Sequence, residues 1–288
     1  MSGRDRADAV QLDPVAGGTV PALGDTAAAP PADAPDTKAL RKRLADLGDE
    51  MAKLQEALYA EARRSLLVVL QARDTGGKDG AIRRVFASLD PMGVEVTSFK
   101  APTPVELGHD YLWRVHQRVP SRGMIGVFNR SHYEDVLIVR VHGLVPEEVW
   151  RKRYDQINAF ERHLSENGVR ILKFCLHISR DEQRRRLLAR LADPTKNWKF
   201  NPGDLKERQR WDDYTAAYAD AIRFTSTAWA PWYIVPADSK PWRDVLMAQA
   251  IVEALEQMAP QYPAPAPTVA AFLKELEGEA TSGAGPPG

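Results

Sequence analysis

The chain has 288 residues, of which 44% are hydrophobic and 27% are charged, and its basic and acidic residues are equal in number. This is ordinary globular composition, sufficient for a sizeable core. The longest purely apolar runs are about five residues against the ~20 that cross a bilayer, and no apolar stretch follows the first residues, so we expect neither a membrane span nor a secretory signal.

The balanced charge hides a pattern along the chain. Residues 71–210 hold 26 Lys and Arg against 18 Asp and Glu, whereas both flanking regions are acidic. A positive centre raises the local concentration of an anionic ligand. The alternative is that many of these charges lie on solvated helix faces, as we expect for the run Arg184 to Arg186.

The two ends of the chain differ in composition from the middle. Residues 1–36 are rich in Ala, Pro, Gly and Asp. The other end of the chain contains "YPAPAPT" (262–268) and "TSGAGPPG" (281–288). Such segments bury too little apolar surface to offset the cost of ordering. We therefore predict a disordered N-terminal tail (1–36), a core (37–262) and a disordered C-terminal tail (263–288).

The core begins with an apolar pattern typical of a long helix. Six apolar residues recur at alternating spacings of four and three: Leu40, Leu44, Leu47, Met51, Leu54 and Leu58. They form one face of a helix, which we expect to pack on the domain rather than in a dimer seam.

Five short apolar runs follow, separated by helical patterns. They read as strands at 66–70, 94–99, 124–129, 170–178 and 232–237. Several are apolar on successive residues, as in strands buried on both faces. Alternating strands and helices predict an α/β fold with a parallel sheet covered by helices on both sides. The single cysteine, Cys175, lies in the fourth run, excludes an intrachain disulfide and favours a cytoplasmic protein.

The segment "QARDTGGKDG" (71–80) directly follows the first strand and opens a helix. Gly76, Gly77 and Gly80 allow close backbone approach, helix N-terminal amides point toward an anion, and Lys78 can bind phosphate. We therefore predict a phosphate-binding loop.

Two acidic residues make this loop unusual. The ordinary pattern has a hydroxyl residue after the lysine, where this chain has Asp79, and Asp74 lies inside the loop. Either carboxylate could hold magnesium for phosphoryl transfer. The structural alternatives are a turn-forming role for Asp74 and a favourable helix-dipole interaction for Asp79.

A second polar segment, "FNRSHYEDV" (128–136), follows the third strand. Asn129 stands where an Asp commonly meets the metal in phosphate-loop enzymes, and Arg130 could brace a phosphate. Glu134 and Asp135 are further metal candidates. Alternatively, Glu134 completes a capping box with Ser131, and a second such box begins at Ser179.

About fifty residues separate the fourth and fifth strands, far more than a simple crossover needs. Residues 180–230 contain two helical patterns around the break "DPTKNWKFNPGD". We expect a basic helical lid over the carboxyl ends of the strands, where α/β sheets bind ligands.

These three segments together resemble the polyphosphate kinase 2 family, over about residues 40–262. The resemblance implies a P-loop kinase-like three-layer α/β/α sandwich with a five-stranded parallel sheet and a helical lid. It implies catalytic roles for Asp74, Lys78 and Arg130, with the metal at Asp74. Asn129 departs from the Asp that relatives often carry.

The resemblance also assigns binding residues and partners. Phosphate and nucleotide contacts are expected from Gly76, Gly77, Asp79, Gly80, Arg83 and Asn129. Polyphosphate contacts are expected from the lid residues Arg190, Lys196 and Lys199. Magnesium, or alternatively manganese, and a homodimer or homotetramer are implied. The motif "GGKDG" with Asn129 resembles the branch that phosphorylates both AMP and ADP.

Two other functions remain open from the sequence alone. An ATP-dependent nucleotide or small-molecule kinase could use the same core. A nucleic-acid-binding protein could use the positive centre, but it would need aromatic platforms interleaved with basic residues, and no such signature is present.

Overall fold

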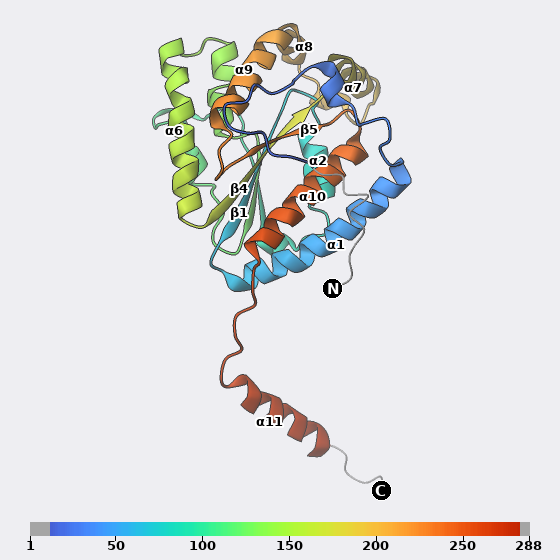
Figure 1. Cartoon of the computed structure of the whole chain (residues 1–288), viewed down its shortest axis with the longest axis vertical. Helices are drawn as coiled ribbons and strands as arrows, with labels where there is room; N and C mark the ends of the chain where they lie inside the picture. The colour runs from blue at the N-terminus through green and yellow to red at the C-terminus, as the bar shows by residue number, and fades with distance from the viewer. Residues whose placement is uncertain (1–11, 283–288) are drawn as a thin grey trace.

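The computed structural model describes residues 12–282, and its body is a three-layer α/β/α sandwich (Figure 1). Within this range five parallel strands form one sheet in the order β2-β3-β1-β4-β5. The strands are β1 (Ser65–Ala72), β2 (Val94–Ser98), β3 (Ile125–Asn129), β4 (Val169–His177) and β5 (Trp232–Pro236). All five predicted strands are confirmed, to within two residues at each end.

Alternate residues of the central strand β1 enter two separate cores. Leu66, Val68 and Leu70 pack toward α1 (Thr37–Glu61), α2 (Lys78–Val85) and α10 (Lys240–Met258). Leu67 and Val69 pack toward α6 (Glu147–Glu166) and α9 (Trp211–Thr225). This is the period-2 alternation of a strand covered on both faces, and it confirms the predicted layers.

The predicted apolar face of α1 is confirmed. Its residues Leu40, Leu47, Met51 and Leu58 are buried, and Leu44 and Leu54 pack against them at the edge. The helix lies along α10 of the same chain (Figure 1). It therefore packs on its own domain, as expected.

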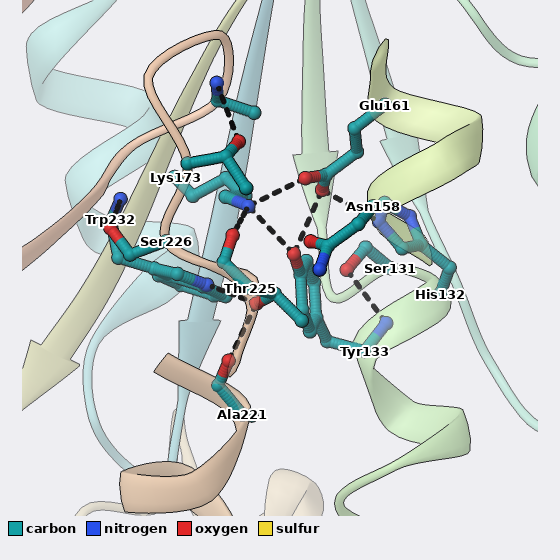
Figure 2. A network of polar contacts seen from close by, with 12 residues as sticks. Ser131, His132, Tyr133, Asn158, Glu161, Lys173, Ala221, Thr225, Ser226 and Trp232 are labelled. Atoms are coloured by element: carbon teal, nitrogen blue, oxygen red, sulfur yellow. Dashed lines mark hydrogen bonds and ion pairs between the residues drawn. The ribbon is translucent and has the colours of Figure 1, made fainter. Parts of the chain in front are cut away.

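A buried network of charged and polar groups connects β4 to helices on one face of the sheet (Figure 2). The Nζ of Lys173, at the middle of β4, donates to Glu161 at 2.6 Å, to the Tyr133 hydroxyl at 2.8 Å and to the Thr225 carbonyl at 2.7 Å. Tyr133 and His132 also contact Glu161. The network therefore connects η4 (His132–Asp135), α6 and the end of α9 to the sheet.

The predicted disorder of the N-terminal tail is wrong for residues 12–36. The Val15 amide donates to the Trp232 carbonyl at 2.8 Å, Leu23 and Ala28 are buried, and residues 25–28 form the short helix η2 (Asp25–Ala28). Small residues and backbone hydrogen bonds thus anchor a segment with few large apolar groups. Residues 1–11 lie outside the described residues.

The predicted C-terminal tail also differs. Residues 269–282 form the helix α11 (Val269–Ser282), which an extended segment separates from the body of the molecule (Figure 1). Residues 283–288 lie outside the described residues. None of the helices in residues 12–282 combines the length and the apolar character that a membrane span requires.

The helical insertion forms between β4 and β5 as predicted. It comprises α7 (Arg180–Ala192), η5 (Asn197–Lys199), α8 (Gly203–Gln209) and α9. The last of these belongs to the core, so only the part before α9 is a cover. The remaining short elements are η3 (Pro91–Gly93), α3 (Pro104–Leu107), α4 (Trp113–His116) and α5 (Ile138–Val141).

Candidate active site

The loop between β1 and α2 turns sharply around Lys78. Gly77 has φ +96° and Thr75 has φ +61°, both in the left-handed region. A side chain at Gly76 would collide with Ala72, so this position also needs a glycine. The turn brings the Nζ of Lys78 within 2.9 Å of the Ala72 carbonyl, to which it donates. The backbone at Gly76 and Gly77 therefore needs glycine, whereas phosphate binding by the loop stays a prediction.

A cavity of about 750 Å³ opens above this loop. Its cationic lining comes from α2, the segments that follow β2 and β3, the insertion and α10. It comprises Lys78, Arg83, Arg84, Lys100, Arg130, Arg185, Arg186, Arg190, Lys196, Lys240 and Arg243. Its acidic lining comprises Asp74, Asp79 and Asp204. This excess of positive charge in a recess favours a polyanionic ligand.

Three residues expected to act in catalysis lie together. Arg130 follows β3, whose last residue pairs with Leu70 of β1, and this register brings the two strand ends side by side. Nη2 of Arg130 lies 3.3 Å from Oδ1 of Asp74, and both residues line the cavity with Lys78. Arg130 has φ +65°, a strained conformation for a residue with a side chain, of the kind that clusters at functional sites.

Lys78 is almost fully buried beneath this group. Burial lowers the pKa of its ammonium, and the neighbouring Arg130 lowers it further, while nearby carboxylates led by Asp74 oppose the shift. A phosphate in the loop would add negative charge and favour the protonated form. An anion bound in the loop would therefore raise the pKa of the Lys78 ammonium.

Asp79 and Asn129 form a second contact across the loop. The Asn129 amide donates to Oδ1 of Asp79 at 2.9 Å, and both line the cavity. Asn129 thus lies where the resemblance expects a ligand-contacting residue, but its amide is turned toward an acid. Arg83, Gly76 and Gly80 line the same cavity, as expected for phosphate contacts.

The other two metal candidates lie elsewhere. Glu134 pairs with Arg130 at 3.7 Å and accepts from Gln71, at a small neighbouring pocket lined by Trp211 and Tyr214 among others. Asp135 pairs with Arg153 at 3.0 Å and does not line the cavity. Burial raises the pKa of Asp135 to about 6.

The expected capping box at Ser131 does not form. The Ser131 hydroxyl accepts from the Tyr133 amide, while the Glu134 side chain turns to Arg130 and Gln71. At Ser179 only half of the box forms, because the Glu182 carboxylate binds arginines instead. Stronger charged partners outcompete a backbone amide in both places.

The carboxylates of the cavity could hold a metal ion together with phosphate oxygens of a substrate. Among residues 12–282 no group of three or more His, Cys, Asp or Glu side chains could hold one. Magnesium is often bound by one or two carboxylates with phosphate oxygens and water. Asp74 and Asp79, on the cavity wall, fit that incomplete kind of site.

Two of the three expected lid residues line the cavity. Arg190 donates to Asp204 at 3.2 Å, Lys196 pairs with Asp193, and both cations line the cavity. Lys199 ends η5. The predicted lid cations at 190 and 196 are thus brought to the same cavity as Lys78.

Sequence reasoning missed the arginines that join the insertion to the loop. Arg186 was expected on a solvated face, but its side chain is buried. Its Nη1 donates to the Thr75 and Gly76 carbonyls, and its Nη2 donates to Ala237 at 2.5 Å. Arg186 lies on the same face of α7 as the buried residues Glu182, Gln183 and Leu187, and that face carries no run of apolar residues that could have revealed its burial. Arg84, Arg185, Lys240 and Arg243 were also missed.

The chain is similar to proteins with established names. A family model described as Polyphosphate kinase 2 (PPK2) matches residues 35–263. An AMP/ADP-polyphosphate phosphotransferase of Meiothermus ruber is 57% identical over 228 residues, covering 79% of this chain and 85% of that protein. An ADP-polyphosphate phosphotransferase of Rhodopseudomonas palustris is 48% identical over 240 residues, covering 79% and 82%. The crystal structure of polyphosphate kinase 2 from Arthrobacter aurescens TC1 matches with a TM-score of 0.84 and 41% identity, over 92% of this chain and 98% of that one.

Proposed function

The chain belongs to the polyphosphate kinase 2 family, and on that premise we propose that its cavity transfers phosphoryl groups between inorganic polyphosphate and AMP or ADP. It is a polyphosphate-dependent nucleotide kinase, and the similar proteins do not favour the ATP-dependent alternative. The observation that carries the proposal is the meeting of Asp74, Lys78 and Arg130 in one strongly basic cavity.

In the reaction the bond between the terminal phosphoryl group and the next phosphate of the chain breaks. A phosphate oxygen of the acceptor forms the new bond to phosphorus, so no side chain attacks. Lys78 and Arg130 lie where they would neutralise charge on the transferring group. Asp74, held by Arg130, would orient the acceptor phosphate for in-line transfer.

We propose Asp74 as the principal metal-binding residue, with magnesium as the metal and manganese as an alternative. A divalent ion in this position supplies charge neutralisation on the phosphates. The support is the carboxylate on the cavity wall beside Lys78, together with the general metal requirement of phosphoryl transfer. Asp79 and Glu134 are secondary candidates, whereas the separation of Asp135 from the cavity removes the support for a metal role there.

Both AMP and ADP are proposed as acceptors, because the relative from Meiothermus ruber is named for both. We also propose a cytoplasmic homodimer or homotetramer, as the resemblance implies. The insertion is proposed to act as a moving lid, supported by its basic residues on the cavity wall.

The proposal is tested with pure protein, magnesium and polyphosphate, adding AMP or ADP in turn and separating the products. ATP replaces polyphosphate as donor in a parallel reaction. We expect ATP to form from either acceptor with polyphosphate. Conversion of ADP alone would reject AMP as an acceptor, while turnover with ATP but not with polyphosphate would favour the alternative kinase.

A further inference from the structure

Arg243 is a fully buried arginine in the first turn of α10, at a distance of more than 160 residues along the chain from the phosphate loop. Its guanidinium nevertheless lies against the loop. A Cβ atom added at Gly77 would overlap with Nη1 of Arg243, and Arg186 lies just beyond it. The glycine is thus required by its positive φ and also by this arginine.

One acid fixes the orientation of the guanidinium. Nε and Nη2 of Arg243 donate to Oδ1 of Asp244 at 2.9 and 2.6 Å. The other oxygen of Asp244 accepts from Nε of Arg84, a residue of α2. Asp244 is itself buried and shared by two arginines, so it does not fully offset their charge.

The third nitrogen of the guanidinium is unpaired. Nη1 of Arg243 is buried and has no hydrogen-bond partner in the described part of the chain. Buried donors are rarely left unsatisfied, because each costs free energy comparable to a lost hydrogen bond, and more for a charged group. An unpaired charged donor against a phosphate-binding loop indicates that its partner belongs to the ligand-bound state.

The surroundings of Arg243 add to this imbalance. Lys240, one turn earlier on α10, lines the same cavity as Arg84 and Arg186. Burial lowers the pKa of the Lys240 ammonium, and Arg186, Arg84 and Arg243 lower it further. Several cations therefore repel one another on this side of the loop, and a bound polyanion would relieve that repulsion.

We propose that Arg243 is a phosphate-binding residue, which supports Gly77 from the side of α10 and whose Nη1 donates to a phosphate that occupies the loop. The inference rests on the proposed function, because it takes phosphate as the ligand of the loop. Since Asp244 already orients the guanidinium, the charge needs no reorganisation when the anion arrives. Lysine would keep the charge but lose the fork that holds it.

The test compares Arg243→Gln and Arg243→Lys with Arg170→Gln as a matched control. Arg170 lies near the start of β4, at the opposite end of the sheet, and its Nε is also buried without a partner. Calorimetric titration with tripolyphosphate, without nucleotide, gives the dissociation constant, and thermal unfolding reports the fold. Steady-state kinetics then separate the KM for polyphosphate from kcat.

Losing a hydrogen bond to a charged group should weaken tripolyphosphate binding about tenfold to a hundredfold in Arg243→Gln. We expect a smaller loss in Arg243→Lys and none in Arg170→Gln. A lower melting temperature with unchanged tripolyphosphate affinity in Arg243→Gln would overturn the inference. If that variant does not fold, unchanged affinity in a folded Arg243→Lys overturns it. Failure of the wild type to bind tripolyphosphate would instead contradict the proposed function.

Discussion

At the scale of single residues, the acids near the loop separate into two groups. Asp74 lies beside Arg130 on the cavity wall, whereas Asp135 is held by Arg153 outside it. Both carboxylates are near arginines, so their charge partners alone do not distinguish them. The two carboxylates are distinguished by their position relative to the cavity, which makes Asp135 a suitable control for Asp74.

We expect Asp74→Asn to fold normally and to lower kcat with ADP by about 10² to 10³, the usual loss when one preorganised electrostatic group is removed. Asp135→Asn should keep wild-type turnover and magnesium dependence. Initial rates over a magnesium series check both variants. Near-normal turnover of folded Asp74→Asn at limiting magnesium would return this acid to a turn-forming role.

Asp135 should also affect the pH dependence of stability. Burial raises the pKa of its carboxyl from 3.8 to about 6, so the folded protein binds this proton more tightly than the unfolded chain. The contribution to stability is therefore present at low pH and is lost as pH rises through about 6. Asp135→Asn has no such loss. Between about pH 4 and pH 7 its unfolding free energy, measured in urea, should rise relative to that of the wild type; a constant difference would contradict the assignment.

At the scale of elements, the sequence patterns predict helices and strands better than they predict contacts between elements. The apolar runs identify β1 to β5, since burial on both faces leaves a direct signal. Arg186 and Arg243 give no such signal, because α7 and α10 reach the loop only through packing far along the chain. The turn of Glu134 toward Arg130 was missed for a local reason, because an arginine four residues earlier competes with the backbone amide of Ser131 for this carboxylate.

The network around Lys173 shows how elements behind the site are joined (Figure 2). Burial opposes the charge of Glu161, but Lys173 and His132 hold the pKa of this carboxyl below its ordinary value. Lys173→Met alone should cost about 3–5 kcal/mol of unfolding free energy, because it leaves a buried carboxylate without its cation. Adding Glu161→Gln should recover part of that cost. Urea unfolding of both single variants and the double variant measures the coupling, and additive losses would contradict it.

The lid is expected to act mainly on the polyanion. Lys199→Ala should raise the KM for polyphosphate more than the KM for ADP, because the resemblance assigns this residue to the chain rather than to the nucleotide. Lys206→Ala is the matched control, since Lys206 is an exposed lysine of α8 that does not line the cavity. Equal increases of both KM values in Lys199→Ala would count against a polyphosphate role for the lid.

At the scale of the whole molecule, the neutral net charge conceals a functional asymmetry. Nine of the 26 basic residues from the middle of the chain line one cavity, where Lys240 and Arg243 of the C-terminal flank join them. The acidic flanks include α11, which lies apart from the body (Figure 1). The layers and the loop were therefore predictable from the sequence. The ordered segment 12–36 was not, because backbone hydrogen bonds and small buried residues leave little trace in composition.

One cavity with one phosphate loop should perform both phosphorylation steps. The most direct measurement is a time course starting from AMP, polyphosphate and magnesium, with AMP, ADP and ATP quantified for the wild type and Asp74→Asn. We expect ADP to accumulate first and ATP to follow in the wild type. In Asp74→Asn both steps should slow by the same factor, within about threefold, because both use the same electrostatic groups. A variant that loses one step and keeps the other would contradict a single shared site.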